Sequence, residues 1–398
     1  MLTIDTAQRR IRLQRRHGLV PGHPATVAEA AAAIVVVHAT DPATVYLSLL
    51  ARCPGAKLGD ISAALYDDRS LVKLIGMRRT MFVVPTDFAP VVHSAAGRAI
   101  AQRLRKQLLQ HLGTHRTEPP VGADLEAWLT DVEAGTERAV DARGEALASQ
   151  LSQDEPRLRT TLIPNGDKAY DVPMKLTSRV LTLMGADGRV VRGRPAGTWL
   201  SRQHRWASVR SLWPDGMPEL PEASAQEELV RRWLGAFGPA TVADLKWWTG
   251  WTLGTTRKLL ARLDVTEVGL EGETQPGVVL SHDLEPEPAA PPTAALLPAL
   301  DATPMGWQRR EWFLGPHQPA LFDRNGNIGP TVWWDGRIVG GWAIREGEIV
   351  WRLLEDIGAE GEVAVAEVAG LLQGRLDGAT VIPSFRTPLE RELVEGGS

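Results

Sequence analysis

The strongest constraint on the fold comes from the order of helices and turns expected between residues 225 and 282. Apolar residues recur at helical spacing after Gln226, and Gly238-Pro239 ends that helix. Thr241 caps a second helix, Gly250 turns the chain, and a third helix leads into two short strands joined by a Gly-rich turn. The expected elements cover residues 226–236, 242–248, 256–263, 265–270 and 278–281. Helix, helix, turn, helix and β-hairpin in this order predict a winged helix-turn-helix.

Two earlier segments repeat this order in a more diverged form. In residues 121–215, three expected helices precede a basic hairpin at 188–194, and in residues 25–95 three expected helices precede strands at 71–75 and 77–84. The expected helices lie at 122–133, 140–152, 173–185, 25–34, 42–52 and 57–67. We therefore predict an α+β fold with three tandem winged-helix domains. Because such domains also serve as structural or protein-binding units, the third copy, with few basic residues on its last helix, is the candidate for an architectural role.

The character of the chain changes after residue 283. A Pro/Ala-rich stretch at 285–298 has the composition of a linker, and short Trp-containing strands follow it. Asn325-Gly326 and Asp335-Gly336 are two-residue hairpin signals. The pattern predicts a small C-terminal antiparallel β domain, barrel-like and closed by a helix near 361–375, in which the Trp side chains form the core. The predicted domains are 1–115 (winged helix with an N-terminal helix), 116–220, 221–284, and 285–398 (linker and β domain).

The distribution of charge favours a polyanionic partner although the formal net charge is −4. Residues 1–115 hold 15 Lys and Arg against 7 Asp and Glu, and residues 157–210 hold 11 against 3. Attraction to phosphate depends on this local field, because salt screens interactions beyond about 10 Å. Solvated surface charge is the alternative for either block alone, but both blocks are rich in Arg and fall on wing-like segments. We expect double-stranded DNA as the partner.

Little else in the composition restricts the function. No apolar stretch approaches the roughly 20 residues of a membrane helix, and no secretory signal follows the N-terminal arginines. Cys53 is the single cysteine and has no internal disulfide partner. We expect a cytoplasmic, nucleoid-associated monomer that uses no metal and no organic cofactor.

Basic side chains on the expected hairpins are the candidates for contact with DNA phosphates. The expected strand after Gly76 carries one group of these side chains. The expected hairpin of the second copy, together with the segment that follows it, carries the other group. The candidates are Arg78, Arg79, Thr80, Arg189, Arg192, Arg194, Arg202 and Arg205.

A polar tripeptide, His38-Ala39-Thr40, lies between a helix end and the helix that begins at Asp41-Pro42. If this short stretch is extended, side chains two residues apart point to the same face, so the imidazole and the hydroxyl converge. The structural alternative is that Thr40 or Asp41 only caps the next helix, with Pro42 in its first turn.

The chain resembles the AlkZ/YcaQ-like DNA glycosylases over nearly its whole length. The resemblance rests on three motifs: His38–Tyr46, Gly76–Val84, and Leu296–Asp301 together with Phe322–Thr331. It implies tandem winged helices, a C-terminal β domain, and excision of alkylated purines, including interstrand crosslinks made by natural-product genotoxins. In that family the catalytic element is Gln-Φ-Gln or Gln-Φ-Asp, where Φ is hydrophobic, and its position falls on His38-Ala39-Thr40.

This chain has neither Gln, so the chemistry must come from other groups. An N7-alkylated purine is already a cationic leaving group, and the enzyme has to aim water at C1′ and stabilise positive charge there. A neutral His38 can take the proton of that water as a general base, and Thr40 can hydrogen-bond the same water. A protonated imidazole would repel the oxocarbenium-like centre, so we expect activity to fall towards acid pH.

The predicted function is therefore a monofunctional DNA glycosylase for repair or genotoxin self-resistance, with His38 and Thr40 as catalytic residues. It would hydrolyse the N-glycosidic bond of N7-substituted or crosslinked purines in duplex DNA. The alternative is a non-catalytic winged-helix DNA-binding protein, either a transcriptional regulator or a protein that shields lesions.

Overall fold

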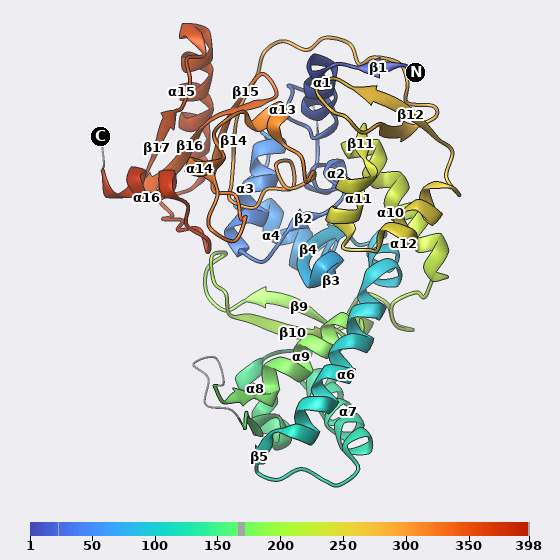
Figure 1. Ribbon diagram of the computed structural model, residues 1–398. Coiled ribbons are helices and arrows are strands. Elements are labelled where there is room, and N and C mark those ends of the chain that lie inside the picture. The colour runs from blue at the N-terminus through green and yellow to red at the C-terminus, as the bar shows by residue number, and fades with distance from the viewer. Residues whose placement is uncertain (23, 166–171, 397–398) are drawn as a thin grey trace. The chain divides into compact units, whose positions relative to one another are not determined.

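One order of elements, helix–strand–helix–helix–strand–strand, recurs in three copies along the chain (Figure 1). In the second copy two further strands, Thr161–Ile163 and Met174–Lys175, lie between the second and third helices. The first copy consists of α2 (Val27–Ala33), β2 (Val37–His38), α3 (Pro42–Arg52), α4 (Leu58–Tyr66), β3 (Leu71–Gly76) and β4 (Thr80–Pro85). The second consists of α7 (Leu125–Arg143), β6 (Glu145–Leu147), α8 (Ala148–Asp154), α9 (Leu176–Ala186), β9 (Val190–Pro195) and β10 (His204–Ser208). The third consists of α10 (Glu222–Phe237), β11 (Ala240–Thr241), α11 (Val242–Thr249), α12 (Leu253–Leu260), β12 (Val265–Leu270) and β13 (Gly277–Leu280). In each copy the last strand lies between the other two, as in the order β6-β10-β9.

The computed structural model describes residues 1–22, 24–165 and 172–396. The chain folds into two compact units. The first contains residues 1–71, 82–85 and 227–398, and the second contains residues 72–81 and 86–226. Each unit is a mixture of helices and short, mostly antiparallel strands.

Helix ends in the first unit follow local capping rules. Thr26 and Glu29 form a reciprocal capping box on α2, and Thr241 and Asp244 form one on α11. Gly250 ends α11 with a left-handed φ of 74°. The predicted roles of Thr241 and Gly250 are thus confirmed. The start of α12 was placed too late, because Thr252 rather than Thr255 caps it.

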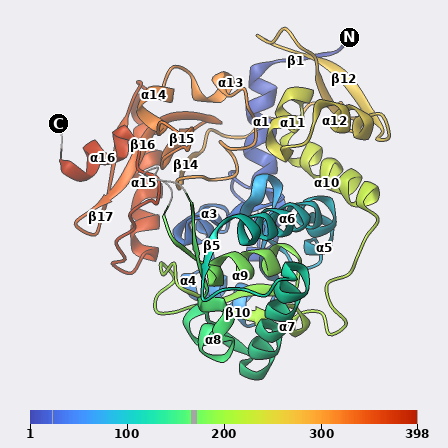
Figure 2. The ribbon, with the colours of Figure 1, turned by 60° about the horizontal axis from the view of Figure 1, so that its bottom comes forward.

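The predicted break between residues 133 and 140 is wrong, because α7 runs without interruption to Arg143. Gly135 lies inside this helix, where the carboxylate of Glu155 occupies the space that a Cβ would need. The helix ends instead at Gly144, whose φ is 72°. Figure 2 shows α7, α8, α9 and β10 together in the second unit. The other elements of this unit are α5 (Ala89–Val92), a π-helical turn at His93–Gly97, α6 (Arg98–Thr114) and a small sheet of β5 (Arg116–Glu118), β7 (Thr161–Ile163) and β8 (Met174–Lys175).

The N-terminus belongs structurally to the third copy. Strand β1 (Thr3–Ile4) pairs in parallel with β12, and α1 (Thr6–Arg16) follows it. Arg12 and Arg16 of α1 both form ion pairs with Asp283. The stretch predicted as a linker is also held on α1, since Arg15 donates to the carbonyl oxygens of Pro288 and Ala289.

The C-terminal β domain is an open sheet, so the prediction of a barrel-like domain is wrong. Its antiparallel order is β14 (Ala294–Leu297), β15 (Thr331–Trp334), β16 (Arg337–Arg345) and β17 (Glu348–Leu353). Four short strands leave β14 and β17 as edges, whereas small closed barrels commonly have about eight strands. Helix α15 (Gly358–Arg375) packs against β14, β15 and β17, and α16 (Pro388–Glu395) packs against β16 and β17. Two short helices, α13 (Glu311–Leu314) and α14 (Gln318–Leu321), precede the sheet's second strand.

Within the part of the chain that the structure describes, no helix combines the length and the apolar character needed to span a bilayer.

Candidate functional site

The polar tripeptide lies where strand β2 gives way to helix α3. Val37 and His38 pair with Val83 and Phe82 of β4, which makes this stretch extended. His38 is half-buried, and its ring meets the ring of Phe82 edge-on with centroids 5.8 Å apart. Thr40 is exposed, and its backbone N–H donates a long hydrogen bond of 3.5 Å to Nδ1 of His38. An imidazole nitrogen and an exposed hydroxyl-bearing residue therefore occupy one short junction at the surface.

The side chain of Asp41 bonds to two backbone N–H groups, one in α3 and one near the C-terminus. Its side chain is buried, with 5% of its surface exposed, and Oδ1 accepts the N–H of Ala43 at 3.1 Å as the N-cap of α3. Oδ2 accepts the backbone N–H of Ser384 at 2.7 Å. The cap was predicted and is confirmed. The second bond joins residues 343 positions apart, so no local pattern in the sequence indicates it.

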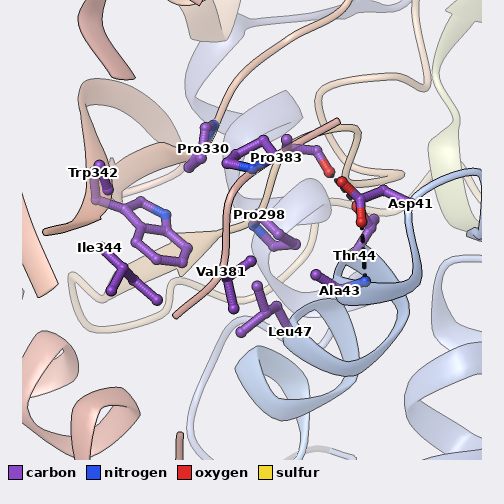
Figure 3. Close-up of a pocket in the computed structure, with 12 residues that line it drawn as sticks. Asp41, Ala43, Thr44, Leu47, Pro298, Pro330, Trp342, Ile344, Val381 and Pro383 are labelled. Atoms are coloured by element: carbon purple, nitrogen blue, oxygen red, sulfur yellow. Dashed lines mark hydrogen bonds between the residues drawn. The ribbon is translucent and has the colours of Figure 1, made fainter. Parts of the chain in front are cut away.

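A small cavity of about 20 Å³ lies beside the first turns of α3 (Figure 3). Its walls are mostly apolar side chains, among them Leu47, Trp342 and Val381. Its polar members already have partners, since Thr44 donates to the carbonyl of Ala299 at 2.8 Å and both Asp41 oxygens are used. The cavity thus lies beside the helix that follows the tripeptide, and its polar groups are committed to the protein.

A fully buried polar network ties α3 to the segment after β14. Arg52 forms an ion pair with Asp301 at 2.7 Å, and both side chains have no exposed surface. Asp301 also accepts from the hydroxyl of Ser48 at 2.6 Å, and Arg52 donates to the hydroxyl of Thr303 at 2.6 Å. Burial raises the pKa of Asp301, but the charge and hydrogen bonds of Arg52 outweigh this effect and lower it. The motif Leu296–Asp301, noticed in the sequence, therefore supports the helix that follows the tripeptide.

In the second unit, the first group of predicted DNA contacts lies in a tight turn. Arg78 and Arg79 are exposed and both have positive φ, 55° and 61°. Non-glycine residues adopt this left-handed conformation infrequently. The prediction that a strand carries these arginines is wrong, because only Thr80, which is half-buried, belongs to β4.

The second group is spread along the β9–β10 hairpin, whereas Arg189, Arg192 and Arg194 were predicted together at its tip. Residues 190–195 form strand β9, and the connection to β10 covers 196–203. Arg189 precedes β9 and forms ion pairs with Glu133 and Glu137 at 2.8 and 2.7 Å. Arg194 and Arg202 are exposed, and Arg205 donates to the carbonyl of Pro195 at 3.3 Å. The exposed guanidinium groups are thus at the end of the hairpin, and that of Arg189 is held by two carboxylates.

Arg192 belongs to a half-buried basic cluster that the sequence did not reveal. Its guanidinium lies 5.7 Å from the ring centroid of Trp206, and burial lowers its pKa to about 10. Burial and the charge of Arg192 lower the pKa of Lys73 to about 8 and that of His204 to about 4. Nε of Arg192 and Nε2 of His204 have no hydrogen-bond partner. Neutral His204 donates Nδ1–H to the carbonyl of Arg202, so its Nε2 is an acceptor, and the unused donor of the cluster is Nε of Arg192. The charge of Arg192 together with this donor suits an anion.

Comparison with known proteins agrees with this organisation. The family model for "DNA glycosylase AlkZ-like" matches residues 31–375. The chain belongs to the AlkZ-like DNA glycosylase family. The resemblance inferred from the three motifs is therefore confirmed.

Two proteins of Streptomyces sahachiroi are similar to this AlkZ-like chain. One is named "Interstrand DNA cross-link repair glycosylase" and is 35% identical over 144 residues, which cover 34% of this chain and 38% of that protein. The other is the solved structure of Streptomyces sahachiroi DNA glycosylase AlkZ, which superposes with a TM-score of 0.73 at 20% identity. That superposition covers 96% of this chain and 99% of the other. At this identity it establishes a shared mixed α/β fold over nearly the entire AlkZ-like chain.

Proposed function

We propose that this protein is a monofunctional DNA glycosylase that hydrolyses the N-glycosidic bond of N7-alkylated or crosslinked purines in duplex DNA. The observation that carries the proposal is the β2–α3 junction, which brings half-buried His38 and exposed Thr40 together where the sequence resemblance implies the family's catalytic tripeptide. The curated relative named as a cross-link repair glycosylase supports crosslinked purines as a substrate class. We also propose a role in repair or in self-resistance to a genotoxin, carried out by a cytoplasmic monomer.

The reaction balances without a cofactor. The alkylated purine is cationic, so breaking C1′–N9 leaves the bonding electrons on the base and neutralises it. Water attacks C1′ through its oxygen, His38 accepts the proton that this water loses, and Thr40 hydrogen-bonds the water in place. An imidazole that is already protonated accepts no proton and repels the oxocarbenium-like centre, so base release should fall towards acid pH.

We further infer that the three repeated copies are winged-helix domains, with boundaries at 1–115, 116–220 and 221–284. The order of helices and strands and the position of the last strand in the middle of each sheet support this assignment. Duplex DNA contacts are proposed for the turn with Arg78, Arg79 and Thr80 and for the hairpin with Arg192, Arg194, Arg202 and Arg205. Arg189, which two carboxylates already hold, would mainly fix that hairpin.

The test is release of free base from a duplex that contains 7-methylguanine, measured by mass spectrometry for the wild-type chain, His38→Ala and Thr40→Ala. We expect both variants to slow release, about 10²-fold or more for His38→Ala. The exposed His282 provides the matched control, since His282→Ala removes an imidazole elsewhere. Release unaffected by both changes would remove these residues from the mechanism. If no alkylated or crosslinked duplex loses a base although duplex binding persists, the protein is a non-catalytic DNA-binding protein.

A further inference from the structure

We propose that a groove in the C-terminal domain binds a backbone phosphate of DNA beside the target nucleotide. The groove lies between the turn Phe322–Asn325, which follows α14, and the segment Ser384–Arg391, which leads into α16. Its volume is about 500 Å³. This inference rests on the proposed function, because DNA is the phosphate source that it names.

Two exposed arginines give the groove its charge, and a third, Arg386, forms an ion pair with Glu390. Arg324 and Arg391 are exposed, and Arg386 is half-buried with Nε donating to Glu390 at 2.7 Å. One terminal nitrogen of Arg386, Nη2, is buried without a hydrogen-bond partner. A guanidinium presents paired donors that match phosphate oxygens, and an unused buried donor costs free energy until an acceptor reaches it. The groove therefore offers both charge and unused hydrogen-bonding capacity to an anion.

Among the described residues that line the groove, the acidic one is Asp323, and its carboxylate does not form an ion pair with the arginines of the groove. Asp323 turns its carboxylate into its own loop, where Oδ1 accepts the N–H groups of Asn325 and Asn327, each at 2.8 Å. Its Oδ2 accepts the side-chain amide of Asn327 at 2.9 Å. The carboxylate is thus used to shape the turn that presents Arg324.

The position of the groove favours a nucleic-acid strand over another anion. Ser384 lines the groove and donates its backbone N–H to Asp41, which directly follows Thr40. One hydrogen bond therefore connects the groove to the predicted reaction centre, and all of these residues belong to the first unit. Half-buried Phe385 adds an aromatic surface beside the arginines, the combination with which proteins hold sugar and base next to a phosphate.

The salt dependence of DNA binding tests this assignment. Fluorescence anisotropy with an undamaged duplex gives log Kobs against log[salt] for the wild-type chain, Arg324→Ala, Arg391→Ala and the double variant. Because each neutralised phosphate contributes about 0.9 to the slope, the double variant should lose about 0.9 from it. We expect about tenfold weaker binding at low salt. Arg345→Ala, which removes an exposed arginine at the end of β16, should leave the slope unchanged.

Two results would overturn the proposal. One is a double variant whose affinity and slope equal those of wild type or of Arg345→Ala. The other is calorimetric binding of inorganic phosphate alone at micromolar concentration that the double variant loses, because the groove would then serve a free anion. Since the duplex is undamaged, these results do not depend on base release, and failure of the glycosylase assay would leave them interpretable.

Discussion

The buried pair Arg52–Asp301 allows a quantitative prediction about the support of α3. Asp301→Asn keeps the size of the side chain but removes its charge. Asp301 accepts two hydrogen bonds from Arg52, one from Ser48 and one from the backbone N–H of Thr303. An Asn amide retains one acceptor oxygen and points an NH₂ group at groups that are themselves donors. The substitution therefore leaves the guanidinium of Arg52 buried without a counter-charge.

The expected cost follows from burial. Breaking a fully buried ion pair by removing one partner destabilises a protein by about 3–5 kcal/mol. At about 2–4 °C per kcal/mol, the melting temperature of the variant should fall by roughly 6–20 °C. The exposed pair Arg352–Glu392 has a similar distance, 2.8 Å, but its side chains are 32% and 55% exposed. Glu392→Gln should therefore cost less than about 1 kcal/mol.

Differential scanning calorimetry measures the melting temperatures of Asp301→Asn and Glu392→Gln. A third variant separates the effect of the buried charge from the effect of side-chain packing. In Arg52→Met/Asp301→Leu both charges are replaced by apolar groups, so most of the lost stability should return. If Asp301→Asn melts within about 2 °C of wild type, the pair does not carry the stability argued here. Equal losses in Asp301→Asn and Glu392→Gln would refute the role of burial.

Two further predictions concern pH and the tripeptide. Burial lowers the pKa of His17 to about 3, so the folded chain keeps this imidazole neutral while the unfolded chain protonates it below about pH 6.5. The free energy of unfolding should fall by up to about 1.4 kcal/mol per pH unit from that cause as the pH drops from about 6.5 towards 3. His17→Gln should show a flatter dependence of melting temperature on pH, and an unchanged dependence would contradict this account. Asp41→Ser retains an N-cap for α3 but loses the bond to Ser384, so base release from 7-methylguanine duplex should fall while the melting temperature changes little. Unchanged base release in this variant would show that the link to the C-terminal segment does not position Thr40.

Local signals in the sequence predicted much of the third copy. Strand 265–270 was placed at its observed bounds, and Thr241 and Gly250 act as the expected cap and stop. These features depend on residues within a few positions of one another, through side-chain capping and the left-handed freedom of glycine. The predicted break between residues 133 and 140 failed, because α7 continues through Gly135, where the close approach of Glu155 leaves no room for a Cβ.

Contacts between distant segments could not be predicted from these patterns. The bond from Ser384 to Asp41 and the pairing of β1 with β12 both join segments that lie more than 250 residues apart in the sequence. The basic cluster of Lys73, Arg192 and His204 is likewise invisible in sequence, because a strand of the first copy and a hairpin of the second supply its members. The tripeptide itself was found because its neighbours, an apolar run and a helix cap, are local.

The net charge of a segment is a poor guide to where this chain binds DNA. Much of the excess in residues 1–115 comes from α1, where Arg12 and Arg16 pair with Asp283 and Arg15 donates to backbone carbonyls. These guanidinium groups stabilise the fold and have little capacity left for phosphate. The acidic C-terminal part, in contrast, presents Arg324, Arg386 and Arg391 around one groove. Salt screening limits electrostatic attraction to nearby charges. The side chains within reach of a phosphate therefore determine where DNA binds, whatever the net charge of the segment that contains them.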